Sequence, residues 1–115
     1  MSIEEIQSIC TSLPGVTEDI KWGHDLCFSV GGKMFCVVGL DQVPTSASFK
    51  VTEDEFDQLS TRPGFKPAPY VAKHKWVWTD DIINLNLRDW KKYISQSHQL
   101  VAAKLPAKTR KQLGL

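Results

Sequence analysis

Two adjacent glycines, Gly31 and Gly32, lie at the centre of the segment LCFSVGGKMFCVVGL and constrain the fold more than any other feature. Glycine adopts positive φ without steric cost, and a two-residue turn between antiparallel strands needs positive φ at its centre. The flanking residues are mostly apolar, aromatic or β-branched, which is typical of strands. The sequence therefore predicts a β-hairpin, and with it an antiparallel sheet.

The turn also predicts the register of this hairpin. With the glycine pair as the loop, Val30 faces Lys33 and Cys27 faces Cys36. Thiols opposite each other could form a disulfide or hold a metal. An odd total of three cysteines without CxxC spacing instead favours reduced thiols that fill apolar space. We expect Cys27 and Cys36 to be reduced and the protein to hold no metal or cofactor.

Hydrophobic periodicity predicts further elements on both sides of the hairpin. Capping-box patterns at Ser2 and Thr52 each begin a helix, and a long three- and four-residue repeat indicates a helix near the C-terminus. Period-two alternation indicates the strands. The expected helices lie at 3–12, after Thr52, at 87–105 and after Pro106, and the expected strands lie at 16–22, on both sides of the glycine pair, at 47–51 and from His74.

The segment FKPAPYVAKHKWVWTD, residues 65–80, combines prolines, aromatic residues and lysines. Proline has no N–H to donate within a sheet, so residues 67–70 should form an edge or a loop. From His74 the alternation places Trp76 and Trp78 on the same side of a strand. Either these tryptophans pack in the core beneath the helices, which burial statistics favour, or they form an exposed aromatic and basic face.

Charge is divided unevenly along the 115 residues, although the formal net charge is only +1. Residues 1–60 hold ten acidic and three basic side chains, and residues 61–115 hold three acidic and eleven basic ones. Such asymmetry indicates binding to nucleic acid or another polyanion, unless the two halves neutralise each other inside the fold. The candidate nucleic-acid-binding residues all belong to the basic half: Lys66, Lys73, His74, Lys75, Trp76, Lys104, Lys108, Arg110 and Lys111.

Signatures of catalysis and of membrane insertion are missing from the sequence. It contains no GxSxG, HExxH, P-loop or GxGxxG motif, and His24, His74 and His98 are expected on three different elements. No apolar run approaches the length of a membrane span, and the N-terminus is acidic where a secretory signal would be basic. We expect a cytoplasmic protein that is not an enzyme.

Several segments, spread over essentially the whole chain, are similar to one family. They are LPGVTEDIKWGHD, FSVGGKMFCVV, SFKV, DEF, RPGFKPAPYVAKHKWVWTD and SQSHQLVAAKLPAKTRKQLG. These segments resemble the MmcQ/YjbR family of small bacterial proteins. The resemblance implies a single α+β domain over residues 1–115, of order α-β-β-β-α-β-β-α, with about five antiparallel strands and helices on one face. It also implies similarity to type III secretion chaperones and, loosely, to frataxin.

Family members are commonly labelled DNA-binding because of a proposed double-wing arrangement, and the family brings no catalytic residue. Three hypotheses of function follow. The first is a nucleic-acid binder that contacts phosphates, the second a protein-interaction or chaperone-like module that uses an exposed sheet face or edge. The third is a small-molecule enzyme, which requires a pocket that collects His24 or His74 with a cysteine or carboxylate. We favour DNA binding by a monomer or weak homodimer, without catalysis and away from membranes.

Overall fold

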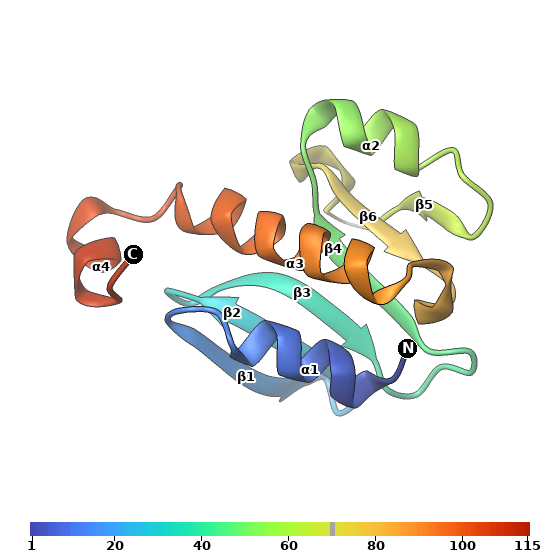
Figure 1. Ribbon diagram of the computed structural model, residues 1–115, viewed down its shortest axis with the longest axis horizontal. Helices are drawn as coiled ribbons and strands as arrows, with labels where there is room; N and C mark the ends of the chain where they lie inside the picture. Colours follow the sequence, from blue (N-terminus) through green and yellow to red (C-terminus); the bar gives the residue numbers. More distant parts are fainter. Residues whose placement is uncertain (70) are drawn as a thin grey trace.

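A twisted antiparallel sheet forms one layer of the molecule, and helices cover one of its faces (Figure 1). The computed structural model describes residues 1–69 and 71–115. The six strands lie in the order β1-β2-β3-β4-β6-β5. The helical elements are α1 (Ile3–Thr11), α2 (Glu53–Leu59), α3 (Leu87–Ala102), α4 (Ala107–Gln112) and the short 3-10 turns η1 (Ala72–His74) and η2 (Ile82–Asn84). The strands are β1 (Val16–Lys21), β2 (Asp25–Val30), β3 (Lys33–Gly39), β4 (Ser46–Lys50), β5 (Phe65–Pro67) and β6 (Trp76–Thr79).

This architecture confirms the expected α+β class with an antiparallel sheet and helices on one side, and it corrects the number of strands. The sheet has six strands where the resemblance implied about five, because four strands and not three precede α2. The proline-rich segment does lie at an edge, with β5 as the outermost strand. Tyr70 lies outside the described residues. No helix in the described part of the chain is long and apolar enough to cross a bilayer.

The core lies between the sheet and the long helix α3. Phe28, Phe49 and Val77 come from β2, β4 and β6 and belong to one buried cluster with Trp90 and Ile94 of α3, and all five are fully buried. Each such side chain contributes about 1.5–3 kcal/mol through the apolar surface that it removes from water. The alternation along each strand therefore fixes which face of the sheet α3 covers.

The register predicted for the hairpin is correct at its turn and wrong beyond it. Val30 pairs with Lys33 as expected, but Phe28 pairs with Cys36, and Cys27 pairs with Val37. A β-bulge is the reason: one extra residue in β3, Phe35, shifts every later pair and turns Cys36 to the opposite face. The predicted opposition of the two cysteines is thus replaced by thiols that lie on different faces of the sheet.

Cys36 instead meets Cys10 of α1 inside the core. All three cysteines are free and buried. The hydrogen bond to Cys36, together with burial, raises the pKa of the Cys10 thiol far above its usual range. The Cys10 thiol therefore remains protonated, and both cysteines act as small apolar residues that pack α1 onto the sheet.

The bulge has a second effect, because a side chain from α3 takes over hydrogen bonds between β3 and β4. The Ser97 hydroxyl accepts the Lys50 N–H at 3.0 Å and donates to the Phe35 carbonyl at 2.5 Å. The ladder between the two strands ends at the pair Cys36 and Phe49. Beyond this pair the strands no longer bond to each other directly, which leaves room for a pocket at that end of the sheet.

Both tryptophans of β6 lie on the face of the sheet that the helices leave open. Trp76 is paired with Lys50 and Trp78 with Ser48, whereas Val77 between them points into the core. Neither tryptophan belongs to the main core cluster, and Trp78 is half-buried, but Trp76 is buried as expected, at 7% exposed. It is buried by side chains at the end of the sheet, and these side chains form the candidate site.

Candidate anion-binding pocket

A pocket of about 400 Å3 opens at the end of the sheet where β3 begins and β4 ends. Its walls come from four parts of the chain that are far apart in sequence: the start of β3, the end of β4, η1 with the start of β6, and the last turn of α3 with the turn that follows it. The lining residues are Lys33, Met34, Lys50, His74, Trp76, Val101, Lys104, Leu105 and Pro106. We call this the basic pocket.

Lys50 is the most unusual residue of the basic pocket. It is only 9% exposed, and its ammonium group donates to the backbone carbonyl of His74. Burial lowers the pKa of the Lys50 ammonium, and the nearby positive charge of Lys104 lowers it further. A buried ammonium without an opposite charge is costly, and none of the described residues that line the pocket is acidic. The pocket is therefore suited to an anion.

The remaining walls of the basic pocket are apolar and well supported. Leu105 is buried against the hairpin turn, where a Cβ added to Gly31 would lie 2.6 Å from the Leu105 Cδ1 atom. Trp76 and Met34 line the floor from β6 and β3. An anion bound by the lysines would thus have an aromatic and aliphatic surface beside it, which suits a ligand with both a charged group and a flat apolar part.

Three of the predicted nucleic-acid-binding residues meet in the basic pocket: His74, Trp76 and Lys104. Two others, Lys66 and Lys75, lie on separate surfaces. Lys66 extends over the Trp78 ring on the open face, with its ammonium 4.5 Å from the ring centroid. Lys75 lies 5.0 Å from the centroid of Phe56, a side chain of α2, and Lys73 is exposed beside His74 in η1.

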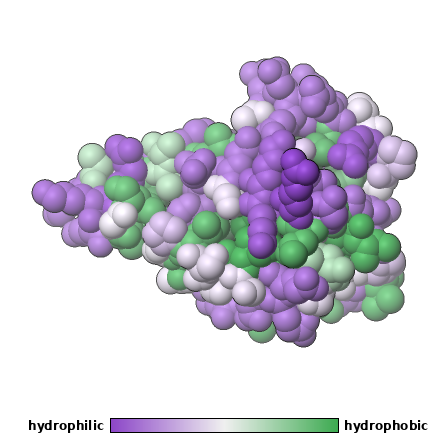
Figure 2. All heavy atoms as spheres, in the orientation of Figure 1, coloured by the Kyte–Doolittle hydropathy of each residue, from purple (hydrophilic) through white to green (hydrophobic). Residues whose placement is uncertain are grey.

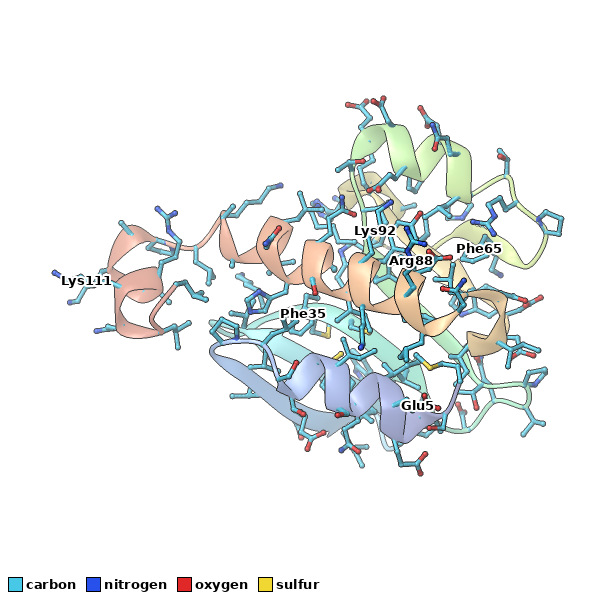
Figure 3. All side chains as sticks on the ribbon, in the orientation of Figure 1. Glu5, Phe35, Phe65, Arg88, Lys92 and Lys111 are labelled. Carbon is cyan, nitrogen blue, oxygen red and sulfur yellow. The ribbon has the colours of Figure 1, made fainter. Side chains whose placement is uncertain are left out.

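The basic residues of the C-terminal tail lie farther away. Lys108, Arg110 and Lys111 belong to α4, which projects at the end of the molecule opposite α2, β5 and β6 (Figure 1). Lys111 points outward from this tip (Figure 3). The nine predicted residues therefore do not form one continuous surface with the basic pocket.

Lys33 and Lys50 are the pocket residues that sequence reasoning missed. Both belong to the first sixty residues, where acidic side chains outnumber basic ones, and the charge argument therefore passed over them. The signal that could have found them is positional. Lys33 directly follows the hairpin turn and Lys50 ends a strand, so both lie at the same end of an antiparallel sheet.

A second, polar pocket of about 210 Å3 lies at the other end of the sheet. There the Leu40 N–H donates to the His24 carbonyl at 2.8 Å, which ties the β1–β2 and β3–β4 loops together. One ligand atom from each of His24, Asp25 and Asp41 lies within 4.8 Å of the others. The His24 Nε2 is 3.7 Å from the Asp25 Oδ1, which is beyond hydrogen-bond distance.

This polar pocket brings a histidine and carboxylates together, as the enzyme hypothesis requires, and Ser46 and Ser48 also line it. The Ser46 hydroxyl donates to the Gln42 side chain and not to His24. His98, by contrast, has a structural part: it is buried, and its ring Nε2 lies 2.8 Å from the Pro14 carbonyl that follows α1. The contact of His98 with the Pro14 carbonyl joins α3 to the turn before β1.

Comparison with known proteins agrees with this fold. The family model described as YjbR matches residues 11–100, which is most of the chain. The chain belongs to the YjbR family. The match includes Lys33, Lys50, His74 and Trp76, whereas Lys104 and α4 lie beyond it. No curated protein matches the sequence of this YjbR-family chain at a significant level.

Two solved structures resemble this YjbR-family protein in fold. The crystal structure of the Deinococcus radiodurans protein DR2400, assigned to family DUF419, has a TM-score of 0.88 at 24% identity, and the match covers 99% of this chain and 88% of that one. A Pseudomonas syringae protein solved by the Northeast Structural Genomics Consortium has a TM-score of 0.70 at 18% identity, with 88% and 99% covered. At these identities the likeness extends to the fold and carries no function.

Proposed function

We propose that this YjbR-family protein binds nucleic acid, preferably DNA, by contacting phosphates with the basic pocket. One observation carries the proposal: Lys33, Lys50 and Lys104 converge with His74 on a pocket whose described lining holds no acidic side chain. Phosphate contacts supply most of the affinity of proteins that bind nucleic acid with little sequence preference. The proposed activity is binding without catalysis.

Exposed lysines near the pocket can extend the contact. Lys73 is exposed next to His74, and Lys66 lies on the open face of the sheet beside Trp78. A strand that leaves the pocket across β6 would pass these side chains, because β5 and β6 are neighbours in the sheet. Since such contacts read the backbone and not the base edges, we expect little base specificity.

The test is a fluorescence-anisotropy titration of labelled single-stranded and duplex DNA at two salt concentrations. We expect binding that weakens steeply between about 50 mM and about 200 mM salt, because each phosphate contact releases counterions. Lys50→Met should weaken binding by at least about tenfold, since a charge-assisted hydrogen bond is lost. Lys91→Met is the matched control, because Lys91 is exposed on α3 beside α1. Absence of binding at the lower salt concentration would contradict the proposal.

A second candidate, a protein-interaction module, is favoured by a different observation. Exposed apolar side chains gather on the loops at the other end of the sheet, where Trp22 is 66%, Val43 99% and Ile83 68% exposed. The Ile82 N–H donates to the Thr45 carbonyl, so η2 lies against the β3–β4 loop. Figure 2 shows hydrophobic residues at this end. Exposed apolar surface of this kind is typical of contact sites between proteins.

The expected partner for this second candidate is another copy of the chain in a weak homodimer. Sedimentation velocity over a range of concentrations would then show a monomer–dimer equilibrium. The double variant Val43→Asp and Ile83→Asp should shift it to monomer, because charge at an apolar interface is not compensated. Leu115→Asp, an exposed apolar position on the C-terminal tail, is the control. A strictly monomeric wild type would exclude this candidate.

A further inference from the structure

The shape of the basic pocket limits what part of a nucleic acid can enter it. Its volume of about 400 Å3 lies in the range of small-molecule sites, roughly 300–1,000 Å3. The hairpin turn and Lys33, η1 and the last turn of α3 wall it on different sides. A duplex is far too wide for a space of this size, and a continuous strand would have to enter and leave it. The terminal nucleotide of a single strand needs only to enter.

The charge of the pocket favours a terminal phosphate over an internal one. An internal phosphodiester carries a single negative charge, whereas a terminal phosphomonoester carries about −1.5 to −2 near pH 7 and has three acceptor oxygens. The Lys50 ammonium makes one hydrogen bond in the described structure, to the His74 carbonyl, and so retains two donor hydrogens. Lys33 and Lys104 also line the pocket, and the positive charge of Lys104 is near enough to lower the pKa of Lys50. A dianion with three acceptors suits a pocket that is lined by three lysines.

The apolar wall of the pocket can contact the part of the ligand that is not phosphate. Trp76, Met34 and Leu105 lie in the same pocket as the lysines. A base or sugar attached to the phosphate can pack against these side chains, and contact between a base and an aromatic ring contributes about 1–3 kcal/mol. The two kinds of wall thus correspond to the two parts of a terminal nucleotide.

We propose that the basic pocket holds the terminal phosphomonoester of a single-stranded nucleic acid, with Lys50, Lys33 and Lys104 around the phosphate and Trp76 beside the nucleotide. This inference rests on the proposed function and adds the part of the strand that is recognised. Internal phosphates contact the exposed Lys73 and Lys66 and contribute a weaker, length-dependent term.

The experiment compares oligothymidylates of about ten nucleotides, a length typical of single-strand sites, each labelled internally so that both ends are free. One carries a 5′-phosphate, one a 3′-phosphate, and one has hydroxyl groups at both ends. We expect at least one phosphorylated form to bind about tenfold or more tightly than the hydroxyl form, as one additional charge-assisted contact predicts. Inorganic phosphate at millimolar concentration should compete with that form more strongly than with the hydroxyl form.

Two variants assign the preference to the pocket. Lys104→Met changes an exposed residue in the turn after α3, where loss of folding is not expected, and should reduce the phosphate preference to less than about half its wild-type factor. Lys50→Met should abolish it, with circular dichroism as the check of folding. Lys91→Met should keep it in full.

The outcomes separate this inference from the proposed function. Equal affinity for all three oligonucleotides would overturn the terminal-phosphate inference and leave nucleic-acid binding in place. A preference that survives both Lys50→Met and Lys104→Met would also overturn it, because the phosphate would then be held elsewhere. Failure of every oligonucleotide to bind at low salt would overturn both.

Discussion

The two ends of the sheet are built from the same strands and yet offer opposite surfaces. At the end that holds the basic pocket, the last turn of α3 and η1 close around Lys33 and Lys50. At the other end, loops carry His24, Asp25 and Asp41, together with apolar side chains that lie open to water. Helices cover the core face of the sheet, and at the pocket end η1 and the turn after α3 add further walls.

This difference shows that the position of a charged residue along its strand decides which end of the sheet it reaches. The half of the sequence to which the residue belongs does not decide it. Lys33 and Lys50 come from the acidic half of the sequence, and they reach the pocket because antiparallel pairing brings the start of β3 and the end of β4 to the same edge. Lys108, Arg110 and Lys111 come from the basic half and lie on α4 instead. Three predictions follow from this contrast, ordered by the size of the expected effect.

The largest expected effect is on the unfolding free energy, when a glycine is replaced by alanine at each end of the sheet. Gly31 has φ +58° and no space for a Cβ because Leu105 packs against it, whereas Gly23 has φ +75° and open space around it. Gly31→Ala should lower the unfolding free energy by about 2–4 kcal/mol, through left-handed strain plus overpacking. Gly23→Ala should cost about 1–2 kcal/mol, from strain alone. Urea unfolding measures both, and equal losses would show that Leu105 does not press on the turn.

The second prediction compares the removal of charges at the two ends of the sheet. The double variant Lys50→Met and Lys104→Met should weaken single-strand binding about 100-fold, because two charge-assisted contacts of about 1.5 kcal/mol each are lost. Asp25→Asn with Asp41→Asn removes two charges from the opposite end and should strengthen binding by no more than about twofold, since screening weakens distant charges. Anisotropy titrations at one salt concentration give both values. A loss of binding in the aspartate variant would place the contact at the wrong end.

The smallest effect concerns stability. The lowered pKa of Lys50 means that the folded state disfavours its ammonium, a cost that is present while the group is charged and disappears as pH rises from the folded pKa toward the ordinary value of 10.5. Lys50→Met should therefore raise the unfolding free energy near neutral pH by up to about 1 kcal/mol. This gain should shrink toward pH 10.5.

Unfolding of wild type and variant at neutral and alkaline pH measures the change, and Lys91→Met controls for the loss of a surface charge. A variant less stable than wild type at neutral pH would mean that the hydrogen bond to the His74 carbonyl outweighs the burial of the charge. Greater stability combined with weaker binding would show that the fold accepts a cost at this residue for the sake of its ligand.

Much of the fold follows from local patterns, and the exceptions have a shared physical cause. The glycine pair, the capping boxes at Ser2 and Thr52 and the proline-rich edge were all recognisable because each depends on a few neighbouring residues. The bulge at Phe35 was not, because it depends on Ser97, sixty-two positions away, to satisfy the backbone that it displaces. The period-two alternation correctly assigned the side chains of β6 to two faces, but it does not say which face the helices cover.

The candidate site was predictable in part for the same reason. His74, Trp76 and Lys104 stood out as basic or aromatic residues in unusual local sequence. Lys33 and Lys50 became site residues only through strand pairing and through the gap that opens between β3 and β4 beyond Cys36 and Phe49. Sequence reasoning that sums charge along the chain does not detect a pocket whose members are gathered by register.

The hydrogen bond from the Lys50 N–H to the Ser97 hydroxyl makes the Lys50 amide a reporter of how often α3 separates from the sheet. The amide proton of Lys50 is held by a side chain of α3 and not by a neighbouring strand. It can exchange with solvent deuterium only when α3 lifts away from the sheet, so its exchange rate measures how often the helix detaches. The ammonium of the same residue faces the pocket, and Val101 and Leu105 link that pocket to the end of α3. A bound anion that holds these walls together would slow exchange at the Lys50 amide. A residue-resolved deuterium-exchange measurement would then detect occupancy of the pocket as less frequent separation of α3 from the sheet.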